Sequence, residues 1–265
     1  MRRALGIAQL AVTLLAAAFL LVPALMSIGA GLTVNYFRGL SSGLTTKWLF
    51  EVWALYADSI WLSLLIALAC LLCTLIIGVP AAYVLAKNPG RLSRAIEEVV
   101  SLPLAIPGLA LALALLQLYG TLQGFRLSWT FILAGHVLYT LPFMIRSVLA
   151  VFTVIDLRTL EEGAASLGAS PWQRFTQIAV PNAMPGILAG ALTVVTLSIG
   201  EFNLTWMLHT PFLKTLPVGL ADSYASMRLE IASAYTLVFF VMILPLLVAL
   251  QLAAARAQRI GETGA

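Results

Sequence analysis

Six long windows without a charged residue dominate this chain. Each window holds between 19 and 34 consecutive residues that include no Asp, Glu, Lys or Arg. A membrane-spanning helix needs about 20 mostly apolar residues, and a helix in lipid satisfies its own backbone hydrogen bonds. We therefore expect six transmembrane helices near the following residues: 5–29, 59–86, 99–119, 129–151, 184–208 and 233–255.

The composition argues against a soluble enzyme, a disordered chain or a disulfide scaffold. Of the 265 residues, 61% are hydrophobic and 10% are charged, and the mean hydropathy is +1.00. A soluble chain is about half apolar and about a quarter charged, so this chain has too little charge to cover a surface in water. The apolar stretches are continuous rather than alternating, which argues against an outer-membrane barrel. The sequence predicts an all-α polytopic membrane protein, folded as one domain over 1–265.

The basic residues are divided unevenly between the two sides of the membrane. Ten of the 15 lie on the side that carries both chain ends, and five lie on the other side. Cytoplasmic loops carry an excess of Lys and Arg, so both termini and the loops after the second and fourth spans are expected in the cytoplasm. The net charge of +4 reflects this bias and does not indicate nucleic acid. The apolar stretch after Arg2 and Arg3 is too long for a signal peptide, whose apolar region runs about 7–15 residues, and is interpreted as an uncleaved helix.

The sequence contains no pattern that indicates a metal site or a redox centre. Cys70 and Cys73 are spaced C-x-x-C but lie inside the second span. A redox motif needs an accessible thiolate, so we interpret both as small apolar packing residues. His136 and His209 are not clustered with thiols or carboxylates.

The loop 152–183 carries two successive helix signatures. Thr159 and Glu162 have the spacing of a capping box, and Gly168 follows where a left-handed residue would end that first helix. Ser170 and Gln173 form a second capping box, and Pro181 is expected to end the second element.

The second of these helices is expected to be amphipathic. Pro171 stands at the favoured first position, and four apolar residues recur on one face: Trp172, Phe175, Ile178 and Ala179. A partner protein could cover that face, as in helix-in-groove docking. Alternatively, the face lies in the headgroup region or against the protein's own spans. The sequence leaves both interpretations open.

This loop resembles the EAA motif of ABC-importer permeases. The family pattern is Glu-Ala-Ala, three residues, Gly, nine residues, then Ile-x-Leu-Pro. Here it reads Glu162-Gly163-Ala164, three residues, Gly168, nine residues, then Ile178-Ala179-Val180-Pro181. Gly163 and Val180 depart from the pattern while the register is intact, and the glycine costs the first helix about 1 kcal/mol in propensity. The proline-broken stretch at 101–108 and the segment 136–146 also resemble the family, so the resemblance covers a core at roughly 59–255.

The resemblance implies a type I importer permease: six transmembrane helices with a cytoplasmic coupling helix between the fourth and fifth. Such subunits pair with an identical or paralogous permease in the bacterial inner membrane, dock on two cytoplasmic ATPases, and receive solute from an extracytoplasmic binding protein. The resemblance assigns the docking to seven residues: Glu162, Gly163, Ala164, Gly168, Ser170, Pro171 and Trp172. ATP and Mg would belong to the ATPases, because this chain has no Gly-rich phosphate loop. It is expected to bind no cofactor and to catalyse no reaction itself.

Four polar residues of the fifth span are candidates for the translocation path: Ser198, Glu201, Asn203 and Thr205. Ionisable groups at membrane depth are costly and usually face the protein interior or a cavity. The competing interpretation is that Glu201 forms a structural pair, for example with His136.

The outer segment 210–217 resembles the subgroup that serves polyamines, ferric iron, thiamine and phosphonates, so an aminoalkylphosphonate or a polyamine is the preferred solute. Two alternatives remain. An ion-driven transporter would use Glu201, but it would need paired broken helices from an internal repeat, which the sequence does not show. An intramembrane enzyme would use His136 with a serine, but no nucleophile–base arrangement can be placed from the sequence.

Overall fold

The computed structural model describes residues 2–263, with side chains throughout that range except at 2–5, 8, 253, 254 and 256–263. Its regular structure is helical, with two isolated antiparallel bridges. Contacts divide the chain into two compact units. The first comprises Met1–Ala57 and Gly219–Met242, and the second comprises Asp58–Val218 and Ile243–Ala265. The ends of the expected 1–265 domain, residues 1, 264 and 265, lie outside the described residues.

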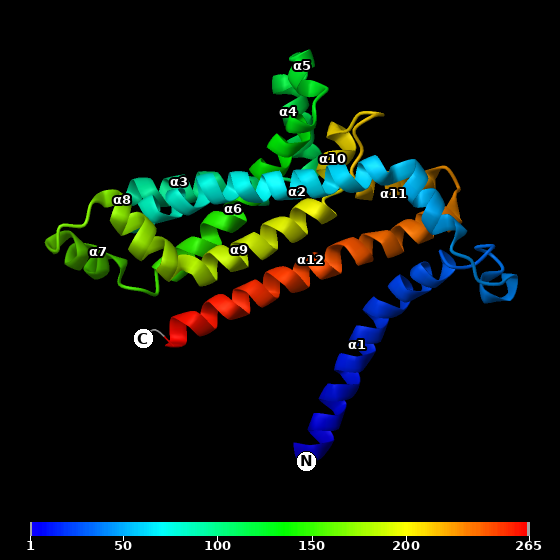
Figure 1. The fold of residues 1–265 in the computed structure, drawn as a ribbon, viewed down its shortest axis with the longest axis horizontal. Coiled ribbons are helices and arrows are strands. Elements are labelled where there is room, and N and C mark those ends of the chain that lie inside the picture. Colours follow the sequence, from blue (N-terminus) through cyan, green and yellow to red (C-terminus); the bar gives the residue numbers. More distant parts are fainter. Residues whose placement is uncertain (1, 264–265) are drawn as a thin grey trace. The chain divides into compact units, whose positions relative to one another are not determined.

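The chain forms twelve α-helices and three short 3-10 or π segments over the described residues (Figure 1). In chain order they are α1 Arg2–Ala30, η1 Gly39–Ser42, α2 Lys47–Lys87, α3 Arg91–Ser101, η2 Leu102–Leu104, α4 Gly108–Tyr119, α5 Gln123–Arg126, α6 Trp129–Phe152, α7 Leu157–Ser166, α8 Pro171–Arg174, η3 Phe175–Ala179, α9 Val180–Gly200, α10 Asn203–Leu208, α11 Leu216–Ala225 and α12 Leu229–Thr263.

Five helical segments are long and apolar enough to cross a membrane, and a bent helix pair makes a sixth candidate, within residues 2–263. The five are Gln9–Ala30, Lys47–Lys87, Trp129–Phe152, Pro171–Gly200 and Leu229–Leu252. Each overlaps one of the expected spans. The spacing of the charge-free windows therefore located the spans correctly, although two of them are not single straight helices.

The expected third span, 99–119, is broken. The segment Arg91–Leu104 and the helix α4 meet at an angle of 103°, and Figure 1 shows α4 turned away from α3. Pro103 and Pro107 explain the break, because proline lacks the N–H that an α-helix uses and disfavours helical geometry in the residue before it. Pro107 itself has an extended ψ of 137° immediately before α4.

The expected fifth span, 184–208, begins earlier and ends earlier than predicted. A continuous helical segment runs Pro171–Gly200, so the prediction that Pro181 ends the loop element is wrong. Pro181 lies in the first turn of α9, directly after the π turn η3, where the ladder of α-helical hydrogen bonds is already interrupted. The helix instead stops at Glu201, whose ψ is 120°, and α10 follows as a separate element.

Two segments expected to be loops contain helix. The outer segment 209–232 includes α11, and α2 begins at Lys47, inside the expected loop 30–58. Tyr56 of α2, in the first unit, has a non-helical φ of −135°. The backbone N–H of Tyr36 donates to Glu230 at 2.9 Å, and the hydroxyl of Ser223 donates to Tyr56 at 3.1 Å.

The core of the second unit is centred on α6 and α9, which pack closely along each other. Gly186 and Gly190 of α9 allow this approach. A methyl group on Gly186 would lie 2.5 Å from the backbone oxygen of Ser147, and one on Gly190 would lie 2.8 Å from the sulfur of Met144. Small residues at helix contacts are a common device in membranes, because they let backbones come close. Cys70 is fully buried in the same core, as its assignment as a packing residue predicted.

We expect Gly186→Ala to destabilise the protein, since its nearest neighbour is backbone and cannot swing away. Overpacking a tight contact typically costs about 1–3 kcal/mol. Gly200→Ala is the matched control, because it lies in the same helix with nothing within 4 Å of the added carbon. Thermal unfolding midpoints in detergent test this. Equal midpoints for the two variants would contradict the close α6–α9 contact.

Candidate functional site

The first loop helix, α7, is capped by Asp156, which the sequence analysis did not identify as a cap. Asp156 accepts a hydrogen bond from the backbone N–H of Thr159 at 3.2 Å and from its hydroxyl at 2.6 Å. These bonds hold the pKa of Asp156 below its usual value. The predicted Thr159–Glu162 capping box is therefore wrong. Aspartate is a strong N-cap, and here it takes the position three residues earlier. Glu162 instead pairs with Arg158 at 2.7 Å.

The glycine turn after α7 is confirmed. Gly168 has a φ of +85°. Its N–H donates to the carbonyl of Ala165, and the N–H of Ala169 donates to that of Ala164, both at 3.0 Å. This is the Schellman arrangement, which satisfies the last carbonyls of a helix and favours glycine at the left-handed position. The turn therefore ends α7 sharply and fixes the direction of the next helix.

The capping box of the second loop helix is also confirmed. The N–H of Gln173 donates to the Ser170 hydroxyl at 3.3 Å, and the N–H of Ser170 donates to the Gln173 side chain at 2.8 Å. Pro171 occupies the first turn. Because both ends of the turn are capped, the two loop helices form a stiff pair rather than a mobile connection.

The apolar face of the second loop helix is covered only in part. Phe175 packs on Tyr83 with ring centroids 5.1 Å apart, and Ala179 is fully buried. Trp172 remains 71% exposed and Leu167, at the turn, 89% exposed. The interpretation that the face packs on the protein's own spans therefore holds for its inner part. The outer part leaves two large apolar side chains open to another molecule.

Glu161 is the residue of this loop that sequence reasoning missed. Its side chain is 5% exposed and lies 2.6 Å from the ammonium group of Lys87. The Tyr83 hydroxyl donates to the same carboxylate, and Arg174 lies 3.5 Å away. The sequence signal is its position four residues after Leu157, which puts both on one helix face, and the structure buries both side chains. A cavity of about 380 Å³ lies beside this group.

A second polar cluster lies at the break that ends α9. His136 of α6 is 1% exposed, and its Nδ1 lies 2.9 Å from the hydroxyl of Ser198. Its Nε2 lies 2.8 Å from the hydroxyl of Thr205 on α10. One imidazole nitrogen can donate and the other accept, so the ring satisfies both hydroxyls and joins three helices.

Glu201 caps the helix that follows it. Its carboxylate accepts from the N–H groups of Leu204 and Thr205, each at 2.9 Å, and from the Thr205 hydroxyl at 3.0 Å. It is therefore linked to His136 through Thr205, which supports a structural role for this carboxylate. Of the four predicted path residues, Ser198, Glu201 and Thr205 come together here, while Asn203 is exposed. Their role in a path stays a prediction.

The two broken spans meet at this point. A methyl group on Gly108, the first residue of α4, would lie 3.5 Å from the carboxylate of Glu201 and from the Cβ of Asn203. Helix ends carry unpaired backbone groups, so the contact brings polar backbone together inside an otherwise apolar region.

The geometry does not support the enzyme alternative. Ser198 lies within hydrogen-bond distance of His136, which is the pairing that such an enzyme would need. However, the two side chains are only 4% and 1% exposed. A nucleophile must reach its substrate, so we interpret the pair as a structural link between α6 and α9.

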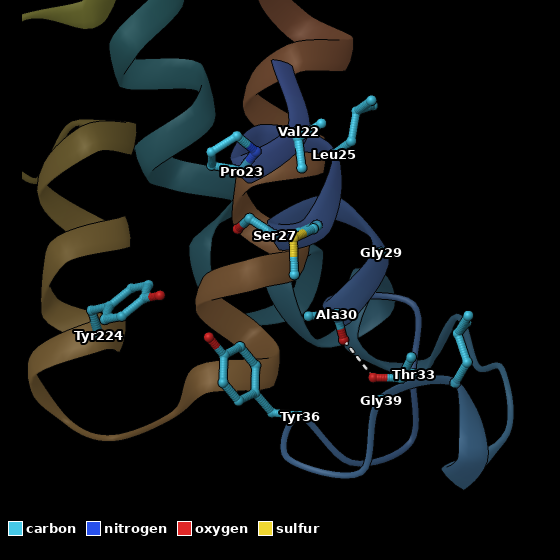
Figure 2. A pocket seen from close by; sticks show the side chains of 12 residues that line it. Val22, Pro23, Leu25, Ser27, Gly29, Ala30, Thr33, Tyr36, Gly39 and Tyr224 are labelled. Atoms are coloured by element: carbon cyan, nitrogen blue, oxygen red, sulfur yellow. Dashed lines mark hydrogen bonds between the residues drawn. The ribbon is translucent and has the colours of Figure 1, made fainter. Parts of the chain in front are cut away.

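A further cavity lies in the first unit (Figure 2). It has a volume of about 840 Å³ and is lined by the end of α1, the turn after it, and the rings of Tyr36 and Tyr224. Thr33 donates to the carbonyl of Ala30 at its edge, at 2.8 Å. It contains none of the predicted site residues.

Thr205→Val should destabilise the protein, because it removes the hydroxyl between Glu201 and His136 while keeping the side-chain shape. A buried polar group left without a partner costs about 1–3 kcal/mol. Thr196→Val is the matched control, since that exposed hydroxyl bonds only the carbonyl of Leu192 in its own helix. Unfolding in detergent would show a lower midpoint for Thr205→Val alone. A similar midpoint for both variants would argue against the cluster.

The fold and the capped loop define a class: a polytopic membrane protein with a stiff helix pair between its fourth and fifth spans. Comparison with known proteins identifies the family. The sequence model of the family described as "Binding-protein-dependent transport system inner membrane component" matches residues 78–260. The chain belongs to this family, and it is a permease subunit of an ABC importer.

Two relatives illustrate the range of the family. PhnV of Salmonella typhimurium, a permease protein named for 2-aminoethylphosphonate transport, is 29% identical over 86% of this chain and 82% of its own length. The molybdenum transport permease protein ModB of Azotobacter vinelandii is 35% identical over 51% of this chain. The match spans 64% of ModB, less than two thirds of its length.

A solved structure supports the fold. A chain of the MetNI methionine ABC transporter, in inward facing conformations, matches 79% of this chain and 97% of its own length with a TM-score of 0.63. At 19% identity, this likeness concerns the fold alone. The resemblance drawn from the loop motif is confirmed at the level of family and fold.

Proposed function

We propose that this chain forms half of a translocation path and is driven through the 152–183 loop by separate ATPase subunits. The observation that carries the proposal is the loop itself. Two capped helices joined by a left-handed glycine hold Trp172 and Leu167 outward, exposed by 71% and 89%. Large apolar side chains on a rigid helix end are the anchors that helix-in-groove docking uses.

The seven coupling residues fit distinct parts of this proposal. Gly168 makes the turn, and Ser170 with Pro171 starts the second helix. Trp172 is the apolar anchor, while Glu162 and Gly163 lie on the exposed side of α7 and Ala164 is half-buried. Glu162 is 65% exposed, so it is free to contact a partner. ATP and Mg would be held by the two ATPases, whose closure would move the loop.

The remaining partners follow from the same proposal. A second permease, identical or paralogous, would complete the path, and an extracytoplasmic binding protein would deliver the solute. Both chain ends and the 152–183 loop would face the cytoplasm. The break near Glu201, where α4 and α10 meet, would line the path, with exposed Asn203 facing it and with Ser198, Glu201 and Thr205 positioning it.

For the solute we propose a tetrahedral oxyanion, with an aminoalkylphosphonate as the first candidate. The relatives described above are named for 2-aminoethylphosphonate and molybdenum transport, and the phosphonate relative matches more of the chain. A phosphonate and molybdate share a compact tetrahedral group of anionic oxygens. A polyamine, the other solute that the 210–217 segment suggested, carries the opposite charge.

Gly168→Val should abolish stable association with the ATPase. A β-branched residue strongly disfavours positive φ, and nothing lies within 4 Å of the added carbon, so the effect comes from the turn and not from crowding. Gly124→Val, at an exposed glycine in α5 with open space, is the control. Detergent extraction and pull-down would recover an ATPase with wild type and control only. Recovery of an ATPase with all three proteins, or with none of them, would contradict docking through this loop.

Uptake measurements in intact cells can separate the solutes. Deleting the gene for this chain should lower uptake of labelled 2-aminoethylphosphonate at least tenfold, because an importer lacking half its path cannot translocate. Re-expression of the chain should restore it. Molybdate and spermidine are measured in the same cells. Loss of spermidine uptake alone would overturn the oxyanion proposal, and loss of molybdate uptake alone would overturn the preference for a phosphonate.

A further inference from the structure

Two neighbouring glutamates of α7 have opposite environments. Glu162 is 65% exposed and pairs with Arg158 one turn earlier on its own helix. Glu161 is 5% exposed, and its partners come from other helices. Successive residues of a helix point about 100° apart, so one carboxylate faces outward and the next faces the protein. The family motif includes Glu162, and nothing in the motif accounts for Glu161.

The partners of Glu161 tie the loop to the second span. Lys87, at 2.6 Å, is the last residue of α2, and Tyr83 donates from one turn earlier on the same helix. Burial alone would raise the pKa of Glu161, but the hydrogen bonds from Lys87 and Tyr83 outweigh it and hold the pKa below its usual value. The carboxylate is therefore ionised at neutral pH, and the contact is a charge-assisted one.

Tyr83 makes the attachment stiffer. Its ring contacts the ring of Phe152 at the end of α6, with centroids 6.3 Å apart, and the ring of Phe175 at the start of η3, with centroids 5.1 Å apart. Arg174, also in the second loop helix, lies 3.5 Å from the Glu161 carboxylate. Both halves of the loop are thus joined to the end of α2 through one buried carboxylate and one ring.

We propose that Glu161 is a positioning residue that transmits displacement of the loop to the second span through Lys87 and Tyr83. This inference rests on the proposed docking of an ATPase on the loop. It separates two tasks of α7: the outer side, with Glu162, contacts the ATPase, and the inner side, with Glu161, carries the motion into α2. Loss of the inner contact should uncouple transport from ATP hydrolysis without releasing the ATPase.

The test uses the assembled transporter in proteoliposomes, with solute uptake and ATP hydrolysis measured on the same preparation. Glu161→Gln should retain the ATPase in pull-down but lower the solute transported per ATP by about fivefold or more, within the range of known coupling energies. Glu98→Gln, an exposed glutamate of α3, is the control and should match wild type. Glu162→Gln should instead reduce ATPase association.

Two further variants guard against a simple folding defect. Tyr83→Phe removes one hydrogen bond and keeps the ring, so it should lower the transport ratio in the same direction but less. Lys87→Met should reproduce Glu161→Gln, and the double variant should be no worse than either single one, because both remove the same contact. If the two single variants lowered the transport ratio independently, so that their effects multiplied in the double variant, the proposal would be overturned.

Failure of this inference can be distinguished from failure of the proposed function. If Glu161→Gln keeps a normal transport ratio, or loses the ATPase as Gly168→Val does, the transmission role is wrong while the docking proposal stands. If wild type itself recovers no ATPase, the proposed function fails and this inference fails with it.

Discussion

Every helix that begins inside this protein leaves backbone N–H groups that need an acceptor. Side chains accept from these groups at three places, two in the exposed loop and one in the part-buried break after α9, where an unpaired group would be costlier. Asp156 caps α7, Ser170 caps α8, and Glu201 caps α10. The candidate functional elements are located where these helices begin. The polar residues that sequence analysis singled out are, to a large extent, the ones that make interrupted helices possible.

The two candidate regions are joined by one helix pair. The 152–183 loop connects the end of α6 to the start of α9, while the His136 cluster joins the same two helices nearer their other ends. His136 lies 16 residues before Phe152, which corresponds to about 24 Å along a helix. The close α6–α9 contact at Gly186 and Gly190 lies between them. A displacement at the loop would thus reach the break at Glu201 through a packed pair rather than through a flexible chain.

The sequence was most informative where one residue type has few alternatives. Charge-free windows located the spans, and Gly168 and the Ser170–Gln173 box were correctly placed because left-handed turns and N-caps have strong residue preferences. The sequence was less informative where tertiary contacts decide the local structure. Pro181 did not end a helix, because the π turn before it had already interrupted the ladder. Asp156 displaced Thr159 as a cap. Glu161 was overlooked because its burial depends on Tyr83 and Lys87, which lie more than 70 residues away.

The opposite environments of Glu161 and Glu162 also limit how the loop can change in length. An insertion of one residue between Asp156 and Glu161 would rotate the rest of α7 by about 100°. The buried carboxylate would then turn outward, and the uncharged side chain of Leu160 would face Lys87. An added residue is therefore compatible with the Lys87 contact only outside the stretch from Asp156 to Glu161, which sets a maximum spacing between the cap and the carboxylate.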